Sequence, residues 1–315
     1  MLVTDSGGSG WAGQRVAGHS FEEWAAYVAR HPDVLDRILS IWNVFDLGAL
    51  KTFLAELDLG RPYVGPPPGH KRYVENRDSI RRLVEEEGFS DADRGYLGRS
   101  YVKRVYSTTA EAYDGVWDSV WTYENRHAVV EALAPKAGEK LLEVGIGTGN
   151  NLKNLPAGVD VTGIDFSPDM LEVCRQKAKG LPCGEVRLLE MDAHKLDFPE
   201  GSFDKVLCFY SLCAVEDPFQ VIREVARVLR PLGRLVIYDV VRSDIPEVTL
   251  IQYLYRPIAR EFGAIYLEFC PPRNITYDAC FDPGGPIREA GLKTVMASYL
   301  DPFRTVLLGV YEKGK

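Results

Sequence analysis

The 315-residue sequence has no apolar run of the roughly 18 residues that cross a bilayer, and its start lacks the basic and apolar regions of a secretion signal. Its six cysteines form no CxxC pair and no spacing typical of a zinc site. Positive charge is scarce too, because the sequence has 37 lysines and arginines but 45 aspartates and glutamates, which gives a net charge of −8. We therefore expect a cytoplasmic protein with reduced thiols, without a metal site, without stable insertion into a membrane and without a nucleic-acid partner.

The first third of the chain is predicted to be helical. After a glycine-rich stretch, 1–20, that we expect to be flexible, apolar residues recur at spacings of three and four from Phe21 to about Leu59. Pro32 lies where a second helix can begin. Each of these helices has one apolar face that must be covered, so we interpret 21–104 as a helical unit that either caps the active site or forms a homodimer interface.

From about residue 135 onward, strands and helices are predicted to alternate, which is typical of a parallel sheet covered by helices on both faces. The five expected strands of this part are 140–146, 159–165, 186–192, 203–212 and 233–240. The final segment, 292–313, reads as two further strands joined at Asp301-Pro302. We predict an α/β fold with a doubly wound, Rossmann-like, seven-stranded sheet that ends in an antiparallel hairpin, with the N-terminal helices as an extension.

The loop after the first of these strands, in "EVGIGTGNN", carries Gly145, Gly147 and Gly149, which allow a tight turn and close approach of a ligand to the backbone. The glycine spacing differs from the dinucleotide pattern G-x-G-x-x-G, and the loop lacks the Gly-Lys-Ser/Thr ending of a phosphate-binding loop. Asp165 and Asp192 close the next two strands, where carboxylates can accept hydrogen bonds from ribose hydroxyls and from an adenine amine. An adenosine without phosphates fits this pattern, which indicates S-adenosylmethionine.

The stretch from about 139 to 240 resembles the class I S-adenosylmethionine-dependent methyltransferases in "LLEVGIGTGNNLKNLPAGVDVTGIDFSPDM", "EMDAHKLDFPEGSFDKVL" and "VIREVARVLRPLGRLVI". It is similar to bacterial phospholipid N-methyltransferases and to small-molecule N- and S-methyltransferases. The resemblance implies a methyltransferase domain over 105–315, with S-adenosylmethionine as the cofactor and S-adenosylhomocysteine as its product. It also implies that the cofactor is bound by Glu143, Gly145, Gly147, Gly149, Asp165, Phe166, Met170, Asp192, Ala193 and Tyr210.

Aromatic residues gather on both sides of this stretch. The resemblance places Tyr113 on a lid over the cofactor and Tyr210 beside the transferable methyl group, and these two with Tyr106 are the candidate catalytic residues. Aromatic rings that face a cation attract it, which suits a sulfonium cofactor. The segment 242–285 is the position of a substrate-recognition insertion in this family. The candidate substrate-binding residues are Trp117, Tyr253, Tyr255, Arg256, Arg260 and Tyr266.

Two histidines, His127 and His194, lie near the predicted site, and neither position favours a role as general base. A neutral amine or a thioether attacks a methyl group without prior deprotonation. We therefore favour transfer to the nitrogen or sulfur of a small soluble metabolite such as an amine, an amino acid or a thioether, with methionine-type S-methylation included. Two alternatives stay open: methylation of phosphatidylethanolamine at a membrane surface, and a cofactor-binding scaffold without turnover.

Overall fold

The computed structural model of the chain describes residues 13–43, 46–64, 106–107, 110–111, 113–114, 120–215, 217–254 and 284–315. These residues divide into two compact units. The first unit contains 13–64, 242–254 and 302–304, and the second contains the remaining described residues.

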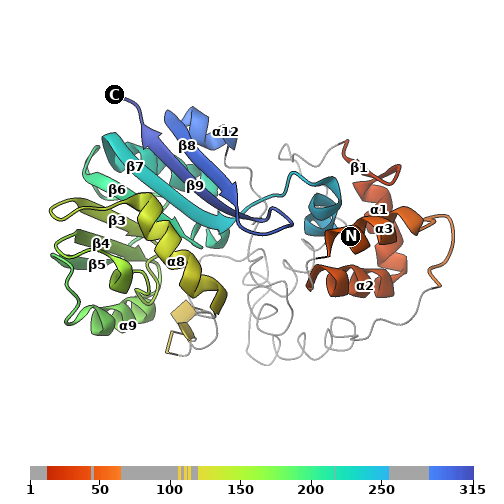
Figure 1. Cartoon of the computed structure of the whole chain (residues 1–315), viewed down its shortest axis with the longest axis horizontal. Coiled ribbons are helices and arrows are strands. Elements are labelled where there is room, and N and C mark those ends of the chain that lie inside the picture. Colours follow the sequence, from red (N-terminus) through yellow and green to blue (C-terminus); the bar gives the residue numbers. More distant parts are fainter. Residues whose placement is uncertain are drawn as a thin grey trace. The chain divides into compact units, whose positions relative to one another are not determined.

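The second unit is built on a seven-stranded sheet with the order β5-β4-β3-β6-β7-β9-β8 (Figure 1). The strands from β3 to β7 pair in parallel, whereas β9 runs antiparallel to both of its neighbours, β7 and β8. The predicted doubly wound sheet with its C-terminal antiparallel hairpin is confirmed. The strands are β3 (Lys140–Val144), β4 (Asp160–Asp165), β5 (Val186–Glu190), β6 (Phe203–Phe209), β7 (Leu229–Val240), β8 (Leu292–Tyr299) and β9 (Val306–Lys313).

Helices cover both faces of this sheet. The helices of the second unit are α8 (Val120–Leu133), α9 (Pro168–Ala178), α10 (Pro218–Val228) and α12 (Gly284–Glu289), with short 3-10 turns η1 (Leu152–Asn154) and η2 (Leu212–Ala214). Buried side chains of α8 and α9 pack with Leu141 of β3 on one face. Those of α10 and α12 pack with Leu142 and Val144 on the other. Successive residues of a strand point to opposite faces, so one apolar strand supplies both cores.

Side-chain caps and turns define where these elements begin. Ser167 caps α9 by accepting a hydrogen bond from Met170 N, and Asp217 caps α10 by accepting one from Gln220 N. In each helix a proline follows the cap, which is a favoured first helical residue. In the turn between β8 and β9, the Asp301 carboxylate accepts hydrogen bonds from the amides of Thr305 and Val306. These local signals are the reason that the sequence predicted the element order.

The first unit begins with two short strands, β1 (Arg15–Val16) and β2 (His19–Ser20), which pair with each other. The helices α1 (Phe21–Arg30), α2 (Pro32–Asn43) and α3 (Leu47–Glu56) follow them along the chain. A capping box of Ser20 and Glu23 begins α1, and Pro32 begins α2 as predicted. The segment 242–254, which follows β7 and is helical from 246, belongs to the same unit. Its Tyr253 ring lies 5.3 Å from the ring of Phe21. The proposed role of 21–104 as a cap or dimer interface remains a prediction.

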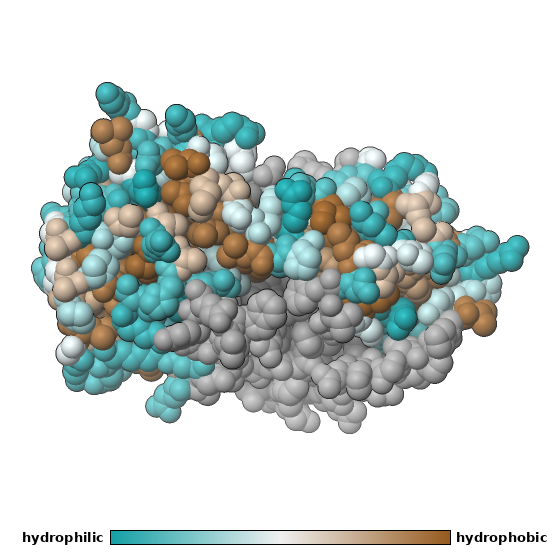
Figure 2. All heavy atoms as spheres, in the orientation of Figure 1, coloured by the Kyte–Doolittle hydropathy of each residue, from teal (hydrophilic) through white to brown (hydrophobic). Residues whose placement is uncertain are grey.

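The surface seen in Figure 2 mixes hydrophilic and hydrophobic residues over both units. Within the described ranges, the large apolar side chains that are exposed are Val64, Phe219, Leu232, Val295, Met296 and Leu300. A helix long and apolar enough to cross a membrane does not occur among the described residues. In the same residues no cluster of three or more histidine, cysteine, aspartate or glutamate side chains could hold a metal ion.

Candidate active site

The glycine loop after β3 packs closely against its neighbours at two of its glycines and leaves open space at the third. Gly145, Gly147 and Gly149 have φ angles of +68°, +55° and +79°, a region that favours glycine. A Cβ atom at Gly145 would lie 2.7 Å from Ser211 Cβ, and one at Gly149 would lie 2.5 Å from Cys174 Sγ. A Cβ at Gly147 would meet no atom within 4 Å. The outer two glycines therefore allow the loop to pack against its neighbours, and the backbone at Gly147 is where a ligand can approach.

Asp165, at the end of β4, holds the tip of this loop. Its Oδ2 accepts a hydrogen bond from Gly147 N at 2.8 Å, and its Oδ1 accepts one from Ser167 N at 2.9 Å. Burial raises the pKa of Asp165, and the two backbone amides oppose that rise. A carboxylate oxygen can accept more than one hydrogen bond, so Asp165 can still receive the two hydroxyls of a ribose.

Glu143, in β3, is a buried carboxylate with an incomplete set of partners. Its Oε1 accepts a hydrogen bond from Asn151 Nδ2 at 2.6 Å, and Asn151 Oδ1 in turn accepts one from Arg126 at 2.7 Å. The Arg126 guanidinium also lies over the ring of Phe209, 4.4 Å from its centre. Within the part of the chain that the structure describes, Glu143 Oε2 has no hydrogen-bond partner. Burial raises the pKa of Glu143 to about 7.

Asp114, next to Tyr113, connects the segment before α8 with the glycine loop. Its Oδ1 accepts hydrogen bonds from Thr148 Oγ1 at 2.6 Å and from Asn150 Nδ2 at 2.9 Å, and Lys177 of α9 forms an ion pair with its Oδ2. Lys177 also donates to Asn150 Oδ1 at 2.6 Å. These hydrogen bonds hold the pKa of Asp114 below its usual range although burial opposes them. Tyr113 is thereby fixed next to the loop that it was predicted to cover.

Three of the predicted tyrosines lie in this part of the second unit. The rings of Tyr106 and Tyr113 are 6.1 Å apart, and Tyr210 packs edge-on against Tyr238 at 5.0 Å. Burial raises the pKa of Tyr113 and of Tyr210, and the Cys213 thiol contributes to both shifts. Tyr210 has a φ of +50°, which is uncommon for a residue other than glycine and marks a strained backbone at the end of β6. The phenols of Tyr113 and Tyr210 therefore stay protonated near neutral pH.

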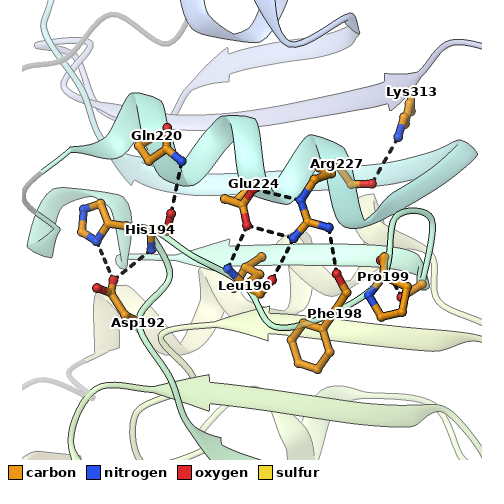
Figure 3. Close-up of polar contacts among 10 residues, drawn as sticks. Asp192, His194, Leu196, Phe198, Pro199, Gln220, Glu224, Arg227 and Lys313 are labelled. Atoms are coloured by element: carbon orange, nitrogen blue, oxygen red, sulfur yellow. Dashed lines mark hydrogen bonds and ion pairs between the residues drawn. The ribbon is translucent and has the colours of Figure 1, made fainter.

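The loop after β5 carries the third predicted carboxylate. Asp192 Oδ1 accepts hydrogen bonds from the backbone amide and the ring Nδ1 of His194, at 2.9 and 2.6 Å (Figure 3). The ring Nε2 of His194 accepts a hydrogen bond from Asp217 N at 3.0 Å. Ala193, between them, is partly buried against the core. Both ring nitrogens of His194 are therefore engaged by neighbouring groups.

The remaining predicted residues are divided. Phe166 follows β4 and is partly buried, while Met170 is buried in the first turn of α9. Tyr253 belongs to the first unit, where it packs with Phe21. The predicted substrate-binding positions that lie outside the described residues are Trp117, Tyr255, Arg256, Arg260 and Tyr266.

Comparison with known proteins identifies this arrangement. Residues 142–237 match the profile of a family described as "Methyltransferase domain". The chain is 44% identical over 103 residues to a phosphatidylethanolamine N-methyltransferase of Cereibacter sphaeroides, a match that covers 32% of this chain and 51% of that enzyme. It is 35% identical over 180 residues to a demethylmenaquinone methyltransferase of Tropheryma whipplei (strain Twist), covering 55% of this chain and 67% of the relative. The chain belongs to the class I S-adenosylmethionine-dependent methyltransferases.

A solved structure shares the fold of this chain. The [4+2]-cyclase SpnF superposes with a TM-score of 0.52 and 17% identity, over 68% of this chain and 95% of the cyclase. At that identity the likeness concerns the fold alone. The chain spans about half of the length of the phosphatidylethanolamine N-methyltransferase that it matches, 51%, and this match is confined to 103 residues.

The side chains of this methyltransferase fit its cofactor. The unpartnered Glu143 Oε2 is suited to the ammonium of the methionine moiety, because a buried carboxylate is stabilised by a nearby cation. The open backbone at Gly147 leaves space for a ligand, and Asp165 has acceptor capacity for a ribose. The sequence had predicted these three residues but not Asn151, Arg126 or Lys177, which hold them in place. A signal for Asn151 was present in the Asn150-Asn151 pair directly after the last glycine.

Proposed function

We propose that this methyltransferase transfers the methyl group to a neutral nitrogen or sulfur atom of a small soluble metabolite, such as an amine, an amino acid or a thioether, methionine included. The observation that carries the proposal is that the described tyrosines and histidines near the site are poorly suited to remove a proton from the acceptor, while we assign Glu143, the carboxyl with the raised pKa, to the cofactor's ammonium. S-adenosylmethionine supplies an electrophilic methyl group on a sulfonium. Transfer is an in-line displacement, so the chain's own residues mainly hold the acceptor in line and exclude water.

The described histidines and tyrosines near the site are poor candidates for a general base. His194 has both ring nitrogens engaged, and His127 lies at an exposed position of α8. Tyr113 and Tyr210 have raised pKa values, which makes their phenolates scarce at neutral pH. A phenol, an alcohol or a thiol usually needs such a base, whereas a neutral amine or a thioether does not.

The tyrosines support a second part of the proposal. A ring that faces a cation stabilises it by about 0.5 to 2 kcal/mol, with the larger values at sites shielded from water. Tyr106, Tyr113 and Tyr210 are partly buried, so their rings are suited to the cofactor's sulfonium and to the ammonium or sulfonium that methyl transfer creates. Methylation of a neutral amine or thioether produces such a cation, which the rings would stabilise as its charge develops.

The 44% identical relative favours a second candidate, because its name gives phosphatidylethanolamine as the acceptor. That acceptor also presents an amine, so the same site chemistry would serve it. The aligned 103 residues cover only 32% of this chain, and the predicted acceptor-binding positions from 255 to 266 lie outside the described residues. We therefore place phosphatidylethanolamine second, and the soluble acceptor first.

A methyl-transfer assay distinguishes these acceptors. The purified full chain would be incubated with methyl-labelled S-adenosylmethionine and, separately, with amines and amino acids, thioethers, phosphatidylethanolamine vesicles, and demethylmenaquinol in detergent. We expect label in a soluble amine or thioether, and none with the Asp165→Asn variant as a control for the cofactor site. Label only in the vesicles would replace the proposal by the lipid acceptor, and label only in the quinol would exclude both.

A further inference from the structure

We infer that His194 is a positioning residue that orients the Asp192 carboxylate for recognition of the cofactor's adenine. The inference rests on the proposed assignment of Asp192 to the adenine amine, and it is independent of the identity of the methyl acceptor. The structure places the ring of His194 between the loop after β5 and the start of α10 (Figure 3).

The hydrogen bonds of His194 determine its tautomer. Because Nε2 accepts a proton from the amide of Asp217, that nitrogen carries no hydrogen, and the ring proton of the neutral imidazole lies on Nδ1. Nδ1–H then donates to Asp192 Oδ1 at 2.6 Å, alongside the backbone amide of His194 at 2.9 Å. Two donors on one oxygen fix the plane of the carboxylate. We propose that the other oxygen of Asp192, Oδ2, contacts the adenine.

The ring is anchored on a rigid element. Asp217 is the N-cap of α10, and Gln220 in the first turn of that helix donates to the carbonyl oxygen of His194 at 3.2 Å. Further along α10, Glu224 accepts from Leu196 N at 2.8 Å, and Arg227 donates to the carbonyl oxygen of Leu196 at 2.8 Å (Figure 3). The whole loop after β5 is thus held along one helix. His194 transmits that rigidity to the carboxylate of Asp192.

This arrangement predicts selectivity for adenine over hypoxanthine. The 6-amino group of adenine donates a hydrogen bond to a carboxylate, whereas the 6-oxo group of hypoxanthine is an acceptor and is repelled by it. A carboxylate placed to accept a hydrogen bond from an amine disfavours an analogue that brings an acceptor to the same position, because two acceptors repel each other. The ratio of affinities for S-adenosylhomocysteine and S-inosylhomocysteine therefore reports on the orientation of Asp192.

Two substitutions separate the two contacts of the ring. The amide of asparagine reaches the place of Nδ1, so His194→Asn can keep the donor to Asp192 and loses the contact with Asp217. The amide of glutamine reaches the place of Nε2, so His194→Gln can keep the contact with Asp217 and loses the donor to Asp192. Gln220→Ala is the matched control, since it removes a contact with the same loop that does not involve Asp192.

The test is calorimetric titration of the full chain and these three variants with both nucleosides, together with thermal melting. We expect the wild type, His194→Asn and Gln220→Ala to prefer S-adenosylhomocysteine by roughly tenfold or more, and His194→Gln to lose about tenfold of that preference. A preference retained by His194→Gln would overturn the inference, and so would an equal loss in all three variants, since that indicates a general structural role. A wild type that binds S-adenosylhomocysteine without preferring it would overturn the assignment of Asp192 as well. Neither result depends on which acceptor is methylated.

Discussion

Binding of S-adenosylhomocysteine should release a proton from Glu143. The pKa of this carboxyl is raised to about 7, mainly because it is buried, and among the described residues only its Oε1 accepts a hydrogen bond, from Asn151 Nδ2. If the ammonium of the ligand pairs with Oε2, the ionised form is favoured and the pKa falls. At pH 7 the free protein carries about half a proton on Glu143, so binding should release about half a proton.

The same linkage predicts how affinity depends on pH. A carboxyl with a pKa near 7 in the free protein and a much lower pKa in the complex weakens binding as pH falls below 7. Between pH 8 and pH 6 the dissociation constant should rise roughly tenfold, because the ligand must displace about 0.9 proton at the lower pH and about 0.1 at the higher. Above pH 8 this contribution levels off.

Calorimetric titration in two buffers with different ionisation enthalpies measures the proton release directly. The observed heat at pH 7 should differ between the buffers by about half of the difference in their ionisation enthalpies. Glu143→Gln is the control, because it preserves the size of the side chain and removes the titration, so its heat should be the same in both buffers. Equal heats for the wild type, or an affinity that does not change between pH 6 and 8, would refute the proposed pairing of Glu143 with the ligand cation.

Four further substitutions test the geometry of the site. Asp114→Asn removes the charge that pairs with Lys177 beside the glycine loop. Because the side chains of this ion pair are about one third exposed, we expect only about tenfold weaker binding of S-adenosylhomocysteine. Unchanged binding would show that the contact does not order the site. Gly145→Ala should lower the free energy of unfolding by about 1 to 3 kcal/mol, since its Cβ meets Ser211, whereas Gly147→Ala should cost less stability but weaken binding, as measured by denaturation and titration. Tyr113→Phe should reduce the rate of methyl transfer without changing the shape of its pH profile between pH 6 and 9, and loss of a titration in that profile would identify Tyr113 as a base.

Local sequence signals predicted the sheet and its helices well. Ser167 and Asp217, each followed by proline, mark the starts of α9 and α10, and the apolar runs between them form the parallel strands. The ends of the strands were less predictable. β6 ends at Phe209, before the expected 212, because Tyr210 adopts a positive φ and the next residues form η2. β7 begins at Leu229, before the expected 233, because Leu229 already pairs with Phe203 across an irregularity in the register.

The supporting contacts of the site could not be predicted because they depend on the folded register. Lys177 and Asp114 are 63 residues apart, and Arg126 is 25 residues from Asn151. Neither pair has a local spacing that indicates a contact. Only the complete order of the strands brings α8, α9 and the glycine loop together. The sequence therefore supplied candidates for binding the cofactor but not the residues that position these candidates.

The acidic residues near the ends of β3, β4, β5 and β7 show how a ligand would complete the site. Asp165 receives two backbone amides, Asp239 receives the amides of residues 212, 213 and 240, and Asp192 receives one amide and the ring of His194. These donors offset the cost of placing a carboxylate away from water. Glu143 is the exception among them, because its Oε1 has an asparagine amide while its Oε2 has no partner among the described residues. Burial raises the pKa of Glu143 to about 7, and a ligand that brings a cation to Oε2 would lower it. The affinity of this methyltransferase for its cofactor and the protonation of Glu143 are therefore two measures of the same interaction.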